Sequence, residues 1–211
     1  MKFTTTTVLA STLALTSARA CPQPLVGGYP VDPACVNVFR LFALIQGGPY
    51  EQNATISYSK KGLAINVEQD SQCRDTSVNY ASLSISPKDA DYQPGGLFLY
   101  TDNPPMQAFV DRSGMGQGIF QFTQGVADQS LPKNAERGPW VITKDLNLFF
   151  DSGNGNVGFQ ACTDDKGKTF SVWLQGVNHP GGHQDCYTFS AQVWPLDTSE
   201  AENPNQCAYT Y

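Results

Sequence analysis

The chain contains few charged residues and very few histidines. Of its 211 residues, 13 are Lys or Arg, 19 are Asp or Glu, and only 2 are His, which gives a formal net charge of −6. Nucleic acids and anionic membrane surfaces select clustered positive charge, which an acidic chain does not offer. We therefore expect neither nucleic acid nor a membrane as a partner.

Long hydrophobic runs are also missing. The apolar stretch Val8–Leu15 has about eight residues, far fewer than the roughly 20 needed to span a bilayer. It follows Lys2 and precedes Ala18-Arg19-Ala20, a small-residue cleavage site, so residues 1–20 are expected to be a signal peptide. The C-terminus lacks the hydrophobic tail of a glycolipid-anchor signal. We expect a secreted mature chain of one domain, residues 21–211, with a net charge of −8 after Lys2 and Arg19 are lost.

The cysteines show no C-x-x-C spacing, which argues against a zinc site and a thioredoxin-like redox motif. All six follow the expected cleavage site, and an even number in an exported chain predicts three disulfides whose pairing the spacing leaves open. They are Cys21, Cys35, Cys73, Cys162, Cys186 and Cys207. Asn53-Ala54-Thr55 is an N-x-S/T sequon, so we expect a glycan on Asn53.

No long segment carries a sustained helical stripe of apolar residues. Tyr187–Trp194 instead alternates, with Tyr187, Phe189, Ala191 and Val193 on one face, until Trp194 breaks the pattern. Val36–Ile45 fits a buried strand or a short helix equally well. The remaining apolar runs are short and are separated by Gly, Pro, Asn and Asp. The pattern predicts an all-β, single-domain sandwich or barrel of many short, mainly antiparallel strands.

Runs of this kind recur along most of the chain. They are Ala54–Ser59, Leu63–Val67, Leu97–Thr101, Ala108–Val110, Ile119–Thr123, Trp140–Thr143, Leu146–Phe150 and Phe170–Gln175. Turn residues such as Pro94-Gly95-Gly96 separate them at intervals typical of a sandwich or barrel.

Catalytic motifs are equally scarce. The only two histidines lie in His179-Pro180-Gly181-Gly182-His183, where Pro-Gly-Gly predicts a flexible turn, so we expect no metal site. A Ser-His-Asp triad would have to use one of these histidines, yet no G-x-S-x-G elbow is present. A glycosidase needs only two converging carboxylates, which sequence spacing cannot reveal. We therefore predict no catalytic residues and no cofactor.

Aromatic side chains offer one candidate for carbohydrate contact. Trp140, Trp173 and Trp194 could each stack on a sugar ring, although most large aromatics of a β-protein belong to its core. Trp173 alternates out of phase with Val172 and Leu174 and is therefore the candidate most expected to be exposed.

Several blocks of the chain share their order and spacing with a known family. They are Val110–Gly118, Pro132–Arg137, Trp140, Gln160–Cys162, Phe170–Trp173, Asn178–Cys186 and Asn203–Thr210. On these blocks the chain resembles the PhiA family of fungal cell-wall proteins, named for the phialide. A fainter similarity, confined to residues 116–193, is to the C-terminal domain of the Pir wall mannoproteins.

The resemblance implies a secreted, glycosylated cell-wall protein associated with phialide and conidium development and without known catalytic residues. Family members have four cysteines, which match Cys73, Cys162, Cys186 and Cys207, so the added pair is expected to be Cys21–Cys35. With it we hypothesise Cys162–Cys186 and Cys73–Cys207.

The leading hypothesis is a non-enzymatic structural or interaction protein of the wall, in contact with wall polysaccharide or other wall proteins. One alternative is a lectin-like carbohydrate-binding module, in which Trp173 would contact sugar. The second is a hydrolase of wall glycans.

Overall fold

The computed structural model describes residues 36–45, 54–87, 94–101, 105–124, 131–196 and 207–210. Residues 1–20, Cys21, Cys35 and the sequon residue Asn53 lie outside these ranges, so the expected signal peptide, the Cys21–Cys35 pair and the glycan stay predictions. In the described part, no helix is long and apolar enough to cross a membrane.

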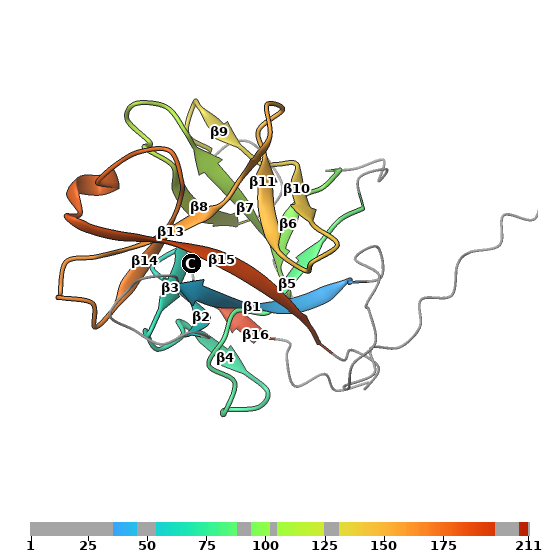
Figure 1. Ribbon diagram of the computed structural model, residues 1–211. Helices are drawn as coiled ribbons and strands as arrows, with labels where there is room; N and C mark the ends of the chain where they lie inside the picture. The colour runs from blue at the N-terminus through green and yellow to red at the C-terminus, as the bar shows by residue number, and fades with distance from the viewer. Residues whose placement is uncertain are drawn as a thin grey trace, which may run out of the picture.

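The described residues form strands, as the alternating patterns predict (Figure 1). A single turn of 3-10 helix, η3 (Pro180–Gly182), accompanies them. The strands are β1 (Val38–Ile45), β2 (Ala54–Ser59), β3 (Gly62–Ile65), β4 (Ser71–Cys73), β5 (Leu83–Ile85), β6 (Leu97–Leu99), β7 (Met106–Asp111), β8 (Ile119–Gln124), β9 (Ala135–Glu136), β10 (Trp140–Ile142), β11 (Leu148–Asp151), β12 (Asn156–Val157), β13 (Phe159–Thr163), β14 (Phe170–Leu174), β15 (Asp185–Pro195) and β16 (Cys207–Tyr209).

The main sheet closes into an antiparallel barrel of eight strands. Its ring runs from β1 through β5, β6, β7, β8, β14, β13 and β15 back to β1. The prediction of an all-β fold is confirmed, and the open choice between sandwich and barrel is resolved as a barrel. Val36–Ile45, which the sequence left between strand and helix, supplies β1.

Two strands of the ring divide their pairing between neighbours. Along the edge of β1 that faces away from β15, Val38 and Phe39 pair with β5, and Phe42 and Ala43 pair with β2. Likewise, β14 pairs with β3 at its start and with β8 at Trp173. The hairpin β2–β3 is therefore inserted between β1 and β14 at one end of the barrel.

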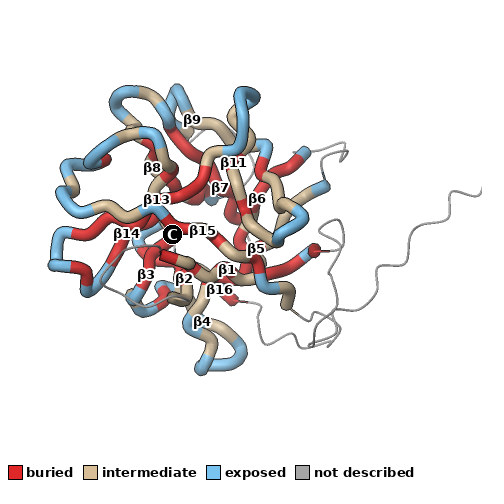
Figure 2. The backbone as a smooth tube through the Cα atoms, in the orientation of Figure 1, coloured by how far each residue is buried: buried red, intermediate tan, exposed pale blue. Residues whose placement is uncertain are grey.

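Aromatic and branched side chains fill the barrel interior. Figure 2 shows that long stretches of the barrel strands are buried. Trp140 is fully buried and packs edge-on against Phe120 and Phe150, with ring centroids 5.2 Å away in both cases. Its indole also lies parallel to the ring of Phe159 at 6.2 Å. Strands β10 and β11 thus contribute to the core, although they belong to a separate three-stranded sheet with β12.

Two disulfides between described residues cross-link directly opposed positions of neighbouring strands. One joins Cys162 of β13 to Cys186 of β15, and the other joins Cys73 of β4 to Cys207 of β16. Both are the pairs expected from the four-cysteine pattern of the family. The second bond attaches the C-terminal strand to a segment 134 residues earlier in the chain.

Tyr209 secures the same C-terminal strand from inside. Its hydroxyl accepts a hydrogen bond from the backbone N–H of Ser82, with 2.9 Å between oxygen and nitrogen. Burial is the main cause that raises the pKa of Tyr209 to about 12, from an ordinary value of 10.0. The neutral phenol is therefore the form that the fold accommodates.

This burial predicts a loss of stability in alkali. The unfolded chain would release the Tyr209 proton near pH 10 and the folded chain only near pH 12, so the stabilisation is complete below pH 10 and is lost as the pH rises through about 12. The loss should reach about 2–3 kcal/mol. Urea unfolding from pH 9 to pH 12 measures it, and Tyr209→Phe should flatten the dependence; an equally steep curve in that variant would assign the effect to other groups.

Candidate functional site

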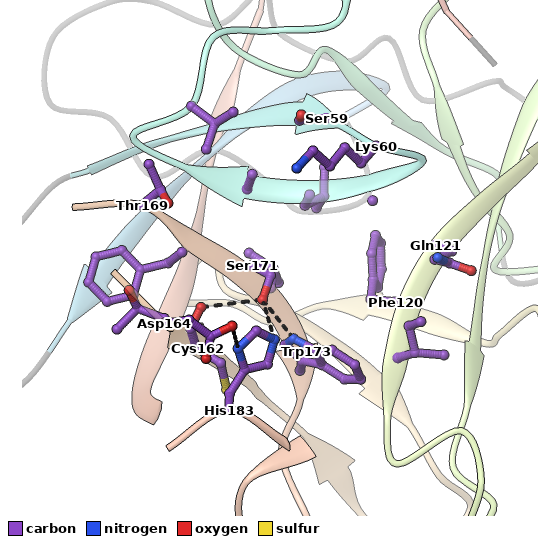
Figure 3. A pocket seen from close by; sticks show the side chains of 18 of the residues that line it. Ser59, Lys60, Phe120, Gln121, Cys162, Asp164, Thr169, Ser171, Trp173 and His183 are labelled. Atoms are coloured by element: carbon purple, nitrogen blue, oxygen red, sulfur yellow. Dashed lines mark hydrogen bonds and ion pairs between the residues drawn. The ribbon is translucent and has the colours of Figure 1, made fainter. Parts of the chain in front are cut away.

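A hollow of about 330 Å³ opens on the barrel where β14 changes partners. Because β14 pairs with β3 at Ser171 but with β8 at Trp173, the edges of β3 and β8 diverge there. Lys60, from the turn between β2 and β3, stands on one side of the hollow, and Gln121 of β8 stands on another (Figure 3). The fork between strands thus opens a hollow that is lined in part by polar side chains.

Four side chains gather at one end of the hollow: Asp164, Ser171, Trp173 and His183 (Figure 3). The indole Nε1–H of Trp173 donates a hydrogen bond to Ser171 Oγ at 2.8 Å. The imidazole Nε2 of His183 lies 3.3 Å from the same oxygen, and its Nδ1 lies 2.8 Å from Asp164 Oδ2. Strand alternation explains why Ser171 and Trp173 point the same way, since they are two residues apart on β14.

His183 reaches this group because the turn before it is compact. The turn that we expected to be flexible forms η3, in which the N–H of His183 bonds to the carbonyl of Pro180 at 3.2 Å. Gly181 lies so close to the indole of Trp173 that an added Cβ would come within 3.0 Å of two ring carbons. Glycine therefore lets the turn close over Trp173 and position His183.

The two histidines do not converge on a common point. His179 has a left-handed backbone, and its Nδ1 lies 3.1 Å from the backbone oxygen of His183. Within the described ranges, no group of three or more His, Cys, Asp or Glu residues could hold a metal ion.

Asp164, His183 and Ser171 are the three residue types of a serine-hydrolase triad. The sequence did not indicate that these three residues lie together. Its geometry differs from that of a working triad in two respects. Asp164 is 67% exposed, and although its oxygen is near Nδ1 of His183, the contact does not have the direction of a hydrogen bond. A triad carboxylate is buried and hydrogen-bonded to that nitrogen.

The hydroxyl of Ser171 is also committed to other groups. It accepts the short bond from Trp173, and it lies 3.3 Å from the carbonyl oxygen of Cys162. A hydrogen bond donated to Oγ occupies one of its two lone pairs and makes the oxygen a weaker nucleophile. Ser171 further lies within β14 and not on a strand-to-helix elbow. These contacts favour a structural role for Ser171, which orients the indole of Trp173.

The neighbouring Asp165 gives the hollow a negative charge at neutral pH. Hydrogen bonds from the backbone and side chain of Thr169 are the largest causes that lower its pKa to about 2, with a further bond from the side chain of Thr163. Both carboxylate oxygens are occupied by these bonds. Asp165 therefore fixes the turn between β13 and β14 and is not available as an acid or base.

The three tryptophans occupy three different environments. Trp140 is buried in the core, Trp173 is half-buried beside the hollow, and Trp194 is 49% exposed. Trp173 lies on the outer face of its strand as its alternation predicts, but it is half-buried, and the tryptophan that is exposed is Trp194. The exposure of Trp194 was not foreseen, although its even spacing from Ser190 and Gln192 was a signal for it.

Known proteins share this sequence along most of its length. The sequence profile of PhiA-like secreted proteins matches residues 39–210. The cell wall protein phiA of Emericella nidulans is 33% identical over 215 residues, covering 100% of both chains, and that of Aspergillus fumigatus is 31% identical over 204 residues, covering 95% of each. The cell wall protein phiA of Aspergillus niger is 37% identical over 118 residues, covering 55% of this chain and 58% of its own.

No solved structure shows a significant match. The fainter similarity to Pir mannoproteins stays a prediction. The profile and the full-length relatives confirm the resemblance seen in the sequence blocks and cysteines: the chain belongs to the PhiA family of secreted fungal cell-wall proteins.

Proposed function

We propose that this protein is a non-enzymatic component of the fungal cell wall, held there by noncovalent contact between the hollow and wall polysaccharide. The observation that supports this most is the arrangement at Trp173. An indole that is half-buried and anchored by a hydrogen bond offers a sugar ring a rigid apolar edge. Polar groups of Lys60, Gln121 and Asp164 line the same hollow and can bond to sugar hydroxyls.

The charge of the hollow indicates which polysaccharides it would accept. Asp164 and Asp165 lie at one end of it, and an acidic sugar placed there would be repelled. Neutral hexose polymers, such as wall glucans, meet no such penalty. Of the alternatives left open by the sequence, the geometry is closest to the lectin-like module. The hydrogen-bonded hydroxyl of Ser171 argues against a serine hydrolase, and the two occupied carboxylate oxygens of Asp165 argue against its pairing with Asp164 as a glycosidase would require.

A role in phialide and conidium development stays a prediction from the resemblance. The barrel and its cross-links would serve any long-lived wall protein, because disulfides persist in an oxidising extracellular setting.

Retention on isolated, insoluble neutral wall glucan tests this proposal. We expect saturable binding that Trp173→Ala weakens at least about tenfold, as loss of an aromatic contact to a ring implies. Trp173→Phe should keep much of the affinity, since it retains a ring and loses only the N–H. Trp194→Ala, which removes the exposed tryptophan, is the matched control and should bind as the wild type does.

Two outcomes would contradict the proposal. Equal retention of the Trp173→Ala and wild-type proteins would remove the hollow as the binding site. Covalent labelling of Ser171 by a fluorophosphonate probe, absent in Ser171→Ala, would instead place the protein among the serine hydrolases.

A further inference from the structure

A second group of side chains, one exposed and three half-buried, lies on the outer face of β1 and β15, the two long strands that run side by side across the barrel (Figure 1). Arg40 and Trp194 are directly opposite each other in this antiparallel pair. Phe42 is two residues further along β1 and shares the face, and Tyr80 approaches from the segment before β5. We call these four residues the Arg40–Trp194 surface.

Arg40 is surrounded by aromatic rings and lacks an acceptor. Its guanidinium carbon is 4.7 Å from the ring centroid of Phe42, 4.8 Å from that of Tyr80 and 5.9 Å from that of Trp194. Among the described residues its side-chain nitrogens have no hydrogen bond or ion pair, and Nε is buried. The charge of this guanidinium is therefore unpaired among the described residues, and its terminal nitrogens can donate to an external acceptor.

Arg112 of the same protein has a guanidinium whose hydrogen bonds are made to a carboxylate. It also lies over an aromatic ring, that of Phe150 at 5.2 Å. Its Nε and terminal nitrogen, however, donate to the two carboxylate oxygens of Glu136, at 2.8 Å and 2.6 Å. Arg112 thus has both an aromatic neighbour and a carboxylate partner. Arg40 has aromatic neighbours, but no carboxylate of the described residues pairs with it.

Trp194 supplies an apolar platform next to this cation. It is 49% exposed, whereas Met115 is the other large hydrophobic residue found exposed in the described ranges. Its ring meets that of Phe42 edge-on, with centroids 6.0 Å apart, which fixes the indole orientation. A rigid exposed indole suits the C–H face of a pyranose ring.

We propose that the Arg40–Trp194 surface binds a hexuronic acid unit of an acidic polysaccharide, with the sugar ring on Trp194 and its carboxylate on Arg40. The carboxylate of a hexuronate is attached directly to the ring, so one unit reaches both opposed residues. The planar guanidinium matches a carboxylate by two parallel hydrogen bonds. The inference rests on the proposed wall location, but not on the hollow.

Electrostatics separate this surface from the hollow. The mature chain is expected to carry a net charge of −8, so most of its surface repels a polyanion. The unpaired guanidinium is a local exception, while the hollow is flanked by Asp164 and Asp165. The two sites should therefore select acidic and neutral sugars respectively, and binding at Arg40 should weaken with added salt.

Calorimetric titration with a short oligomer of β-1,4-linked glucuronic acid tests the proposal. We expect saturable binding that Arg40→Gln and Trp194→Ala each weaken at least about tenfold, the effect of losing charge-assisted hydrogen bonds or a ring contact. Arg112→Gln is the matched control, because it makes the same change of charge at a paired guanidinium; it and Trp173→Ala should stay within about twofold of wild type.

Binding must also depend on the acid group. A neutral cello-oligosaccharide of equal length should bind at least about tenfold more weakly, and Arg40→Lys should recover only part of the affinity because it lacks the planar fork. Circular dichroism establishes that each variant is folded, and Trp194→Ala, at an exposed position, carries the test if Arg40→Gln does not fold.

Three results would each overturn the inference: no binding by the wild type, equal binding of the neutral oligomer, or equal affinity of the Arg40→Gln and Trp194→Ala variants and wild type. Retention on neutral glucan is measured separately. If it persists while glucuronate binding fails, only the acidic-sugar site is lost; if retention fails while glucuronate binds, the hollow is lost as a wall contact.

Discussion

Removal of the Cys73–Cys207 disulfide, by Cys73→Ala with Cys207→Ala, is expected to lower the free energy of unfolding by about 5 kcal/mol. The bond closes a loop with a sequence separation of 134, so its loss frees a large part of the unfolded chain. Without it, β16 is held to β4 by a ladder of only three residue pairs. Such a loss is comparable with the whole stability of many domains.

The Cys162–Cys186 disulfide provides the control. It also joins directly opposed strand residues, but its sequence separation is only 24, for which the same chain-entropy argument gives about 3.5 kcal/mol. Urea unfolding of both double variants, followed by circular dichroism, measures the two losses. A larger loss in the Cys162→Ala/Cys186→Ala protein would show that loop length does not govern the contribution of these bonds.

Replacement of Trp140 by alanine should be the most damaging single substitution in the core. The indole is 0% exposed and contacts the rings of Phe120, Phe150 and Phe159, and its Nε1–H donates to the carbonyl of Arg137 at 3.1 Å. Removal of so large a side chain should cost about 3–5 kcal/mol and leave a carbonyl without its donor.

Trp194→Ala is the matched comparison, since it removes the same side chain from the surface. Its effect on the free energy of unfolding should be about 1 kcal/mol or less, because half of that indole already contacts water. Circular dichroism in urea is the suitable measurement, as both substitutions alter tryptophan fluorescence. An equal loss in the free energy of unfolding of the two variants would mean that the burial of Trp140 does not contribute more to stability than an exposed tryptophan does.

The fold class was predictable because alternation along a strand depends only on nearby residues. Phe189, Ala191 and Val193 are buried as their spacing predicts. Ring closure was not predictable, because a sandwich and a barrel share the same alternation. Closure depends on β1 dividing its pairing between β2 and β5. The pairing of β1 with β5, which closes the ring, joins residues far apart in the chain.

Strand β13 shows a different limit. All five of its residues, Phe159–Thr163, are buried, so no polar face marks it as a strand. Its outward Gln160 is covered because the side-chain amide donates to the carbonyls of Leu174 and Val177. A covering loop of this kind has no signal in the strand's own sequence.

The candidate site was only partly predictable for a related reason. The outward direction of Trp173 follows from its own strand, and it was expected. The approach of Asp164 and His183 to Ser171 depends on the pairing of β13 with β14 and on the compact turn at Pro180, neither of which local patterns indicate. Trp194 was interpreted as a break in alternation, whereas it continues the outward series of β15.

Closure of the ring also determines how the protein behaves when many copies are crowded together. Each of the eight barrel strands has a hydrogen-bonded neighbour on both sides, so none presents a free edge along its paired residues. Unpaired edges are the templates on which β-proteins join into fibrils. The ring therefore offers no template for the edge-to-edge addition of a second copy along these residues, and the unpaired edges of the described sheets are confined to short strands outside it, such as β4, β10 and β12.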